Sequence, residues 1–209
     1  MHPQLERVRL LPGTVLCRAG EAVRHAYFPH TGVISLVGLT AEGHALQVAA
    51  VDRRGFVGVP IVLGTHATAH DIVVHVPGEA HRIRAEHLMT QYQQRPDLRR
   101  ASLGWVHGHV AAIGQSVICH RFHTVRQRLC RWLLISAASV DATTIPVTQE
   151  CLAQILGSPR STVSAAAIQL QDRGVIRLRH GKVQIVDRLA LEASACECHS
   201  TEDPLMTGP

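Results

Sequence analysis

Lysine is almost absent from this chain. Lys182 is the only lysine among 209 residues, so arginine carries nearly all of the positive charge. No apolar run approaches the roughly 20 residues that a membrane-spanning helix needs, and the first residues lack the apolar core of a signal peptide. The six cysteines are too widely scattered for the disulfide framework of a small secreted domain. We therefore expect a cytoplasmic protein that makes no membrane contact.

Sequence patterns of common enzyme classes are also missing. No G-x-S-x-G elbow, phosphate-binding P-loop or H-E-x-x-H motif occurs. Cys130 falls on an apolar predicted helix and not beside a histidine that could activate it. We expect no catalytic residues and no enzymatic activity.

Apolar residues are plentiful, and they make up 46% of the chain, which is ample for a buried core. From about Leu10 to Arg84, short β-prone runs alternate with turn residues such as Pro-Gly and Arg-Arg-Gly. An amphipathic stretch over residues 85–93 follows. The pattern predicts an antiparallel β domain over residues 10–95.

A long helix is predicted over residues 97–120. Its apolar residues are spaced by three and four positions in turn, which is typical of a coiled-coil seam; they are Leu103, Val106, Val110, Ile113 and Val117. This spacing predicts a homodimer, and packing against the chain's own β domain is the alternative. A second helix, from His123 to about Ala138, leads into the C-terminal domain over residues 122–190.

Residues 147–187 have the pattern of a winged helix-turn-helix. A first helix over 148–156, capped by Thr148, ends at Gly157, and Ser158 and Pro159 begin a second helix as its N-cap and first residue. The second helix ends at Gly174, and its apolar residues recur at helical spacing. Two short β-prone runs joined by residues 180–182 then form the wing.

The charge of this region favours a nucleic acid partner. Residues 121–190 hold nine arginines and one lysine against four acidic residues, a net charge of +6, whereas the whole chain has +5. A basic face neutralises backbone phosphates. In a helix-turn-helix, the N-terminal part of the second helix contacts base edges in the major groove of double-stranded DNA. A buried helical hairpin is the alternative interpretation.

The order of β-roll, long helix and winged helix-turn-helix resembles the cyclic-AMP receptor protein/FNR (Crp/Fnr) superfamily of bacterial transcription regulators. The motifs that carry the resemblance are the run RRGFVGVPIVLG, the run VTQECLAQILG, the turn SPRSTVS and the wing sequence HGK. The implied fold is α+β, with a cyclic-nucleotide-binding-like antiparallel β-roll, a dimerisation helix and a C-terminal winged helix-turn-helix. The implied protein is a homodimer that binds an inverted repeat and contacts RNA polymerase.

The resemblance also assigns DNA-binding positions. Arg160 matches a residue that reads guanine in some members, through the O6 and N7 atoms, and Thr148, Thr162 and Lys182 match phosphate-binding positions. The other predicted contacts are Gln149, Ser161, Ser164 and Arg179. The family commonly has glutamate at the position of Ser161 and arginine at that of Ala165, so we expect a different operator.

The β domain departs from the cyclic-nucleotide binders of the family. Gly58 is followed by Val59 and Pro60 where those proteins have a ribose-binding glutamate, and residues 65–71 contain no arginine for the cyclic phosphate. A buried phosphate without a guanidinium or an equivalent donor cluster is strongly disfavoured. We therefore do not expect control by cyclic AMP through the usual site, and the effector is left open.

Cofactor sites are not evident in the sequence. Only Cys17 precedes Cys119, too few thiols for an FNR-type iron-sulfur cluster in that region. Haem or metal sensing remains an alternative because the chain has 15 histidines; those considered are His66, His70, His75, His107 and His109. We expect no cofactor and no metal site. A ligand-binding sensor whose C-terminal domain mediates protein contacts is the alternative function.

The tail, residues 194–209, is polar and contains proline, so we expect it to be mobile. Cys196, Cys198 and His199 lie in it, one residue short of the C-x-x-C-H haem attachment motif. We interpret them as incidental side chains, with adventitious metal binding as the alternative.

Overall fold

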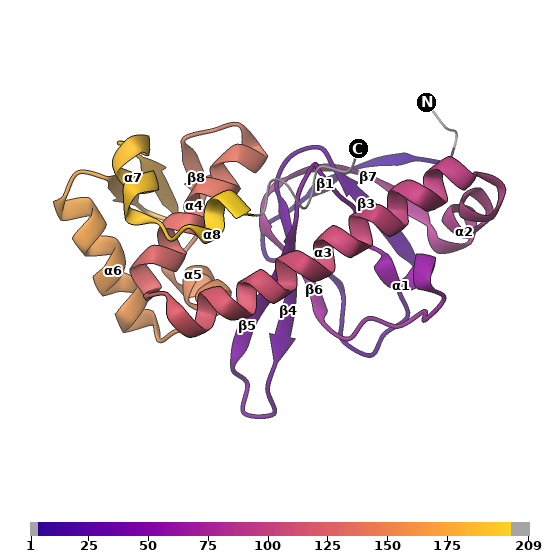
Figure 1. The fold of residues 1–209 in the computed structure, drawn as a ribbon, viewed down its shortest axis with the longest axis horizontal. Coiled ribbons are helices and arrows are strands. Elements are labelled where there is room, and N and C mark those ends of the chain that lie inside the picture. The colour runs from indigo at the N-terminus through magenta and orange to yellow at the C-terminus, as the bar shows by residue number, and fades with distance from the viewer. Residues whose placement is uncertain (1–3, 202–209) are drawn as a thin grey trace.

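The computed structural model describes residues 4–201, which form a β domain and a C-terminal helical domain joined by one long helix (Figure 1). The β domain contains two antiparallel sheets, with strand orders β1-β7-β3 and β2-β6-β4-β5. Its strands are β1 (Glu6–Leu10), β2 (Val15–Cys17), β3 (His25–Pro29), β4 (Val33–Leu39), β5 (Ala45–Val51), β6 (Asp71–Val76) and β7 (Gly78–Arg84). Two helices, α1 (Val59–Leu63) and α2 (Ala85–Gln94), complete the domain.

The β domain begins before the predicted boundary at residue 10. Strand β1 pairs with β7 in register, with Val8 opposite Ala80, and this pairing extends the sheet to Glu6. Ion pairs strengthen the same edge, including Arg82 Nε with Glu6 Oε2 at 2.8 Å. The other strands, β2 to β7, lie within the predicted region of β-prone runs, and their inward side chains contribute to one core.

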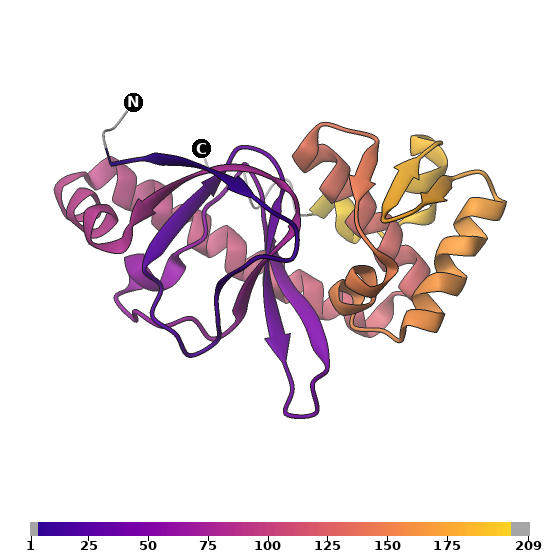
Figure 2. The same cartoon turned by 180° about the vertical axis from the view of Figure 1, so that it is seen from behind.

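Helix α3 (Pro96–Phe122) is a single helix of 27 residues that runs along one side of the β domain (Figures 1 and 2). Trp105 anchors it, with its ring centroid 4.9 Å from that of Phe56 and 4.5 Å from that of His109. A side chain at Gly55 would collide with the indole of Trp105. This close approach fixes the N-terminal half of α3 on the β domain.

The C-terminal domain is built on one apolar core. Its elements are α4 (Val125–Val140), β8 (Thr144–Pro146), α5 (Gln149–Leu156), α6 (Arg160–Asp172), β9 (Ile176–Arg179), β10 (Lys182–Ile185), α7 (Arg188–Ser194) and α8 (Cys198–Thr201). Strand β10 lies between β8 and β9. The core also includes Val33 and Val76 of the β domain, so the two domains share buried contacts.

The junction between α3 and α4 is sharply defined. Helix α3 ends at Phe122, with His123 as its C-cap, and Thr124 is the N-cap of α4, where its hydroxyl accepts from the backbone N–H of Gln127 at 3.3 Å in a capping box. The chain therefore changes direction at the His123–Thr124 peptide, between the long helix and the C-terminal domain.

Contacts outside the shared core also join the domains. Ser139 of α4 donates to Asp52 of the β domain at 2.7 Å. At Gly157, where φ is 54°, a Cβ would lie 2.6 Å from Cδ1 of Leu46. The β4–β5 hairpin therefore contacts the turn between α5 and α6.

Two predictions about local structure are wrong. Ser158 does not cap α6: Pro159 is the N-cap residue, and the Ser158 hydroxyl instead bonds to the Leu156 carbonyl at 3.2 Å. The tail is not free in solvent over residues 194–199, because Cys196 and Cys198 are only 2% and 0% exposed. Residues 202–209 of the predicted mobile tail lie outside the described residues.

In residues 4–201, no helix is long and apolar enough to cross a bilayer.

Candidate DNA-binding site

Helices α5 and α6 form the helix-turn-helix, and their buried sides determine which residues stay accessible. The Thr148 hydroxyl caps α5 by accepting from the Cys151 amide at 3.1 Å. Gly157 makes the turn in the left-handed conformation that glycine adopts without strain. The buried residues of the two helices are Leu152, Ile155, Leu156, Val163, Ala166, Ala167 and Leu170. The N-terminal part of α6 is left at the surface.

The structure leaves five of the predicted contact residues exposed on α6 and the wing. Arg160, Ser161 and Thr162 are exposed in the first turn of α6. Arg179 and Lys182 are exposed and lie opposite each other on β9 and β10. Helix α6 and the wing thus present a set of polar and basic side chains at the surface.

Gln149 and Ser164 differ from the other predicted contacts because they are half-buried and bonded to each other. The Ser164 hydroxyl donates to Oε1 of Gln149 at 2.5 Å, which joins the start of α5 to α6. This hydrogen bond fixes both side chains before any ligand arrives. Thr148, which is exposed, likewise has a structural role as the cap of α5.

Arg160 has one acidic neighbour. Its Nη1 atom lies 4.0 Å from Oε2 of Glu150, and the two side chains are 67% and 65% exposed. An exposed ion pair at this distance contributes little free energy. The guanidinium can therefore leave Glu150 for a base or a phosphate at small cost.

The start of α5, which carries the predicted contact Thr148, lies next to the β domain. A groove between the two domains is lined by Val37 and Leu39 of β4 and, from the C-terminal domain, by Thr148, Glu150 and Gly181. The sequence contained no signal for this groove, because it depends on how the domains pack. The start of α5 therefore faces the β domain.

Some residues of the predicted dimer seam on α3 are exposed, and others pack against the β domain or are half-buried. Leu103, Val110 and Val117, spaced seven residues apart, are 45%, 62% and 66% exposed. Val106 packs against the β-domain core, and Ile113 is half-buried. The alternative of packing on the β domain thus holds for Val106, while an exposed apolar row remains along the helix.

Two of the histidines considered as ligands are buried. His75 places its Nδ1 atom 2.7 Å from the Ser35 hydroxyl, and burial lowers its pKa to about 4. His109 stacks on Trp105, and burial lowers its pKa to about 4 as well. These two rings are therefore neutral core groups near neutral pH.

The remaining histidines of that set lie at or near the surface. His66 and His107 are exposed, and His70 is half-buried in a turn where its backbone amide donates to the Thr68 hydroxyl at 3.2 Å. The structure does not gather the five histidines into one site.

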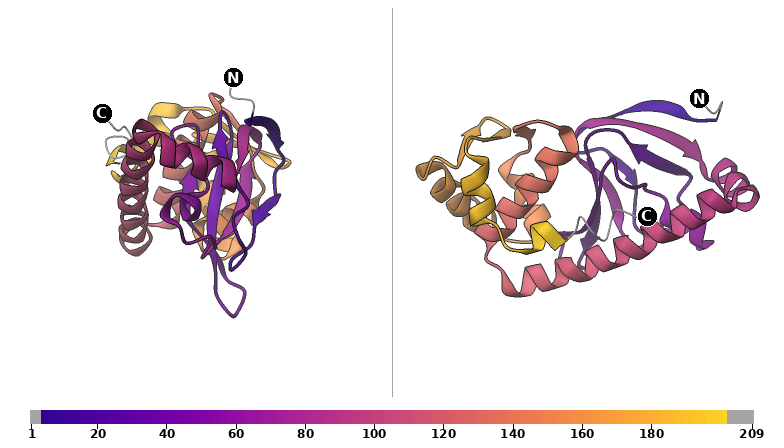
Figure 3. Two further views of the ribbon diagram at one scale, coloured as in Figure 1. Left: turned by 90° about the vertical axis from the view of Figure 1, so that its right-hand side faces the viewer. Right: turned by 45° about the horizontal axis from the view of Figure 1, so that its top comes forward.

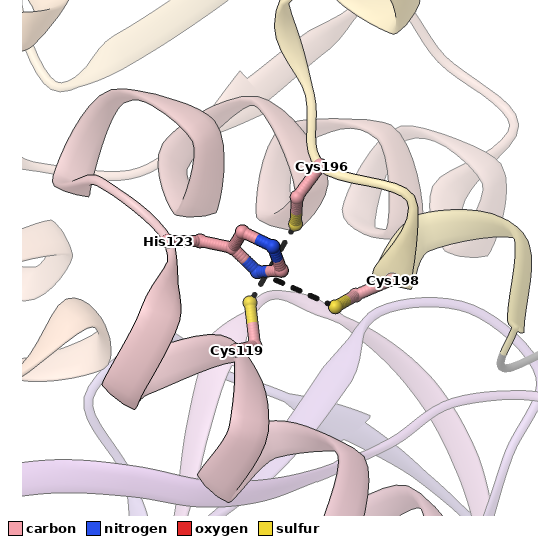
Figure 4. Close-up of side chains that lie close together, drawn as sticks. All are labelled: Cys119, His123, Cys196 and Cys198. Atoms are coloured by element: carbon pink, nitrogen blue, oxygen red, sulfur yellow. Dashed lines mark hydrogen bonds between the residues drawn. The ribbon is translucent and has the colours of Figure 1, made fainter.

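A cluster of possible metal ligands occurs instead where the tail meets the end of α3. It consists of Cys119, His123, Cys196 and Cys198, whose ligand atoms all lie within 4.8 Å of one another (Figure 4). Sequence reasoning missed this cluster because 73 residues separate its two halves, from 123 to 196. The available signal was the pair of short spacings, Cys-x-x-x-His and Cys-x-Cys, which suits metal ligands.

Comparisons with known proteins agree for both domains. The cyclic nucleotide-binding domain family matches residues 7–95, and the Crp-like helix-turn-helix domain family matches residues 127–194. Among solved structures, the c-di-GMP-responsive global regulator CLP of Xanthomonas campestris has a TM-score of 0.69 at 18% identity, with 87% of this chain and 94% of that chain covered.

Two further solved structures have the same architecture. A CRP-family transcriptional regulator of Thermus thermophilus has a TM-score of 0.68 at 19% identity, covering 90% of this chain and 96% of that chain. FixK2 of Bradyrhizobium japonicum has a TM-score of 0.68 at 13% identity, covering 92% and 98% of the two chains. No curated protein sequence matches the chain significantly.

Proposed function

Because the chain belongs to the Crp/Fnr superfamily of transcription regulators, we propose that it is a sequence-specific DNA-binding regulator acting as a homodimer on an inverted repeat. The observation that carries the proposal is the exposed first turn of α6 together with the exposed basic residues of the wing. A recognition helix needs an accessible N-terminal part to contact base edges, and basic neighbours to contact phosphates. Arg160 is the proposed base-reading residue, and Lys182 a proposed phosphate contact.

The homodimer is supported by the apolar row on α3. Exposed valines and leucines at heptad spacing are costly in water and are typical of a helix with a partner helix. Two copies of α3 would place two recognition helices in successive major grooves, one helical turn of DNA apart. The operator would accordingly have two-fold symmetry.

Independence from cyclic AMP is part of the proposal. The loop over residues 65–71 offers no guanidinium, and its Thr68 hydroxyl donates to the His70 carbonyl at 2.8 Å. That hydroxyl is thus engaged within the loop. A cyclic phosphate at the family's usual position would lack its charged partner. Micromolar binding of fluorescent cyclic AMP would contradict this part.

The proposal is tested by selecting bound duplexes from a random DNA pool with the full chain, with and without cell extract. The expected result is an enriched inverted repeat whose affinity falls steeply with salt, because basic side chains release counterions from phosphates. Enrichment of no sequence, together with salt-independent binding, would favour the alternative of a sensor that contacts proteins through its C-terminal domain.

A further inference from the structure

The cluster at the end of α3 has the composition of a metal centre. Cys119 and His123 lie one helical turn apart at the C-terminal end of α3, Cys196 lies between α7 and α8, and Cys198 is the first residue of α8. The three cysteines are 0%, 2% and 0% exposed, and the His123 side chain is 12% exposed. Three sulfur atoms and one imidazole converging from two elements are a typical ligand set of a closed structural zinc site.

The distances between these ligand atoms fit a single ion. Sγ of Cys119 lies 3.6 Å from Sγ of Cys196, and Sγ of Cys198 lies 3.5 Å from Nδ1 of His123 (Figure 4). Tetrahedral bonds of about 2.3 Å to sulfur and about 2.0 Å to nitrogen place neighbouring ligand atoms about 3.5–3.8 Å apart. All ligand atoms lie within 4.8 Å of one another, which leaves no room among them for a cluster of several iron atoms.

The surrounding residues have the arrangement that metal ligands require. The other nitrogen of His123, Nε2, lies 3.2 Å from Oε1 of Glu197, so a carboxylate accepts from Nε2 and directs Nδ1 toward the sulfur atoms. Such a carboxylate–histidine pair is the usual support of a metal-bound imidazole. Gln115 Nε2 donates to Sγ of Cys198 at 3.0 Å. Both supports leave ligand lone pairs free to point into the cluster.

The charge near the cluster also suits a thiolate-rich centre. Three thiolates and one divalent ion have a net charge of −1, and the positive charges of Arg128 and Arg131 act on Cys119. Arg128 also donates to the Leu156 carbonyl at 2.8 Å and to the Ser158 hydroxyl at 3.2 Å. One arginine therefore links the surroundings of the cluster to the turn of the helix-turn-helix.

We propose that Cys119, His123, Cys196 and Cys198 bind one tetrahedral, thiophilic divalent cation, with Zn²⁺ as the best match. The ion fastens the tail to the end of α3, directly at the His123–Thr124 junction between α3 and the DNA-binding domain. A bound ion therefore fixes the angle between the long helix and α4 (Figure 3). The site itself does not depend on DNA binding, whereas its effect on the recognition helix rests on the proposed function.

The first test measures metal in the full chain. The protein is purified without chelator from zinc-supplemented cells, and zinc is counted by plasma mass spectrometry, with about one ion per chain expected for a single closed site. The reduced, metal-free protein is then titrated with Co²⁺, whose intense visible bands identify tetrahedral sulfur coordination. A chain that binds neither ion, that contains acid-labile sulfide, or that forms a Cys119–Cys196 disulfide instead would overturn the site.

Two variants and one control refine this test. Cys198→Ser removes a ligand and is expected to abolish the Co²⁺ bands, whereas Cys17→Ala, in the β domain, is expected to leave them unchanged.

Glu197→Gln keeps every ligand and is expected to weaken zinc affinity about 10-fold or more in a chelator competition, since loss of a residue that orients a metal-bound histidine has effects of that size. Because the Glu197 side chain is exposed, this variant keeps the test valid if Cys198→Ser fails to fold. Unchanged affinity in Glu197→Gln and unchanged bands in Cys198→Ser would also overturn the assignment.

The second test concerns DNA. Removal of zinc by a chelator is expected to lower affinity for the selected duplex about 10-fold or more, and re-addition of zinc is expected to restore it, because a freed junction populates other domain angles. A metal-loaded protein whose DNA affinity does not change on zinc removal would disprove the role at the junction and leave the metal site intact. A metal-loaded protein that selects no DNA would instead contradict the proposed function alone.

Discussion

The proposed DNA-contact surface of the C-terminal domain and the interior of the β domain place their polar side chains differently. In the C-terminal domain, Arg160, Arg179 and Lys182 lie at the surface above an apolar core. Inside the β domain, buried polar groups bond to one another, as where the buried Ser35 hydroxyl lies 2.7 Å from Nδ1 of His75 and donates to Gln47 at 2.8 Å. The first arrangement is ready for an external partner.

This difference indicates where a ligand can be bound at low cost. A ligand at the surface of α6 and the wing replaces water and one weak ion pair. A ligand that displaced the Ser35–His75 contact inside the β domain would have to replace hydrogen bonds that already exist, and each buried group left without a partner costs about 1–3 kcal/mol. The match to the cyclic nucleotide-binding domain family concerns the fold and does not by itself identify a ligand.

The largest effect is expected on α3, which both domains share. The double substitution Val110→Glu and Val117→Glu places like charges from both copies at the proposed dimer seam and should convert the dimer to monomers. Loss of bivalent binding lowers affinity for the inverted repeat by about 10²–10⁴-fold. Sedimentation and fluorescence anisotropy measure the two effects, and Leu63→Glu on exposed α1 serves as the charge control. A double variant that stays dimeric would place the interface elsewhere.

The next effect concerns the buried bond between the domains. Ser139→Ala removes the donor to Asp52 and should lower the free energy of unfolding by about 1–3 kcal/mol in urea at neutral pH. Ser136→Ala is the matched control, because the buried Ser136 hydroxyl has no hydrogen-bond partner among residues 4–201. Equal losses in both variants would remove the special role of Ser139.

The same bond predicts a pH dependence. Burial acts to raise the pKa of Asp52, but hydrogen bonds from Arg54 and Ser139 outweigh it and hold the pKa below its ordinary value of 3.8. A carboxyl whose pKa is lower in the folded state stabilises the fold above pH 3.8, and this contribution is lost as pH falls through the folded pKa. In Ser139→Ala, acid unfolding monitored by circular dichroism should therefore begin at higher pH than in the unsubstituted chain.

A more local effect is expected at the recognition helix. Arg160→Ala should cost about 1–3 kcal/mol at one base position and relax the preference there. Arg160→Lys should recover little of it, because an ammonium lacks the planar fork that donates bidentately to guanine. Arg173→Ala, at the other end of α6, is the control for lost charge. A preference unchanged in Arg160→Ala would remove Arg160 from base reading.

The smallest effect is expected in the wing. Lys182→Ala should weaken binding about equally for all duplexes and reduce the slope of log affinity against log salt by about 1. Anisotropy titrations at several salt concentrations measure that slope. A sequence-dependent loss would instead make Lys182 a base-reading residue.

A feature of this protein was predictable from the sequence when its interacting residues lie close together in the chain, and not when they lie far apart. The helix-turn-helix was predictable because Thr148, Gly157 and the apolar spacing of α6 act within a few residues of one another. The inter-domain bond of Ser139 with Asp52 was not predictable, because it spans 87 positions. The same holds for Cys196 and Cys198, since a polar, proline-containing tail gives no local indication that two of its thiols are buried.

The contact between Leu46 and Gly157 has a consequence for building hybrid regulators. Any side chain at position 157 would meet the Leu46 side chain, whose Cδ1 atom lies 2.6 Å from where a Cβ would be. A recognition domain transplanted from a relative with a larger residue there would have to displace the Leu46 side chain or bring its own hairpin from the same donor. The β4–β5 hairpin is thus a compatibility element, and chimeras should exchange it together with the helix-turn-helix.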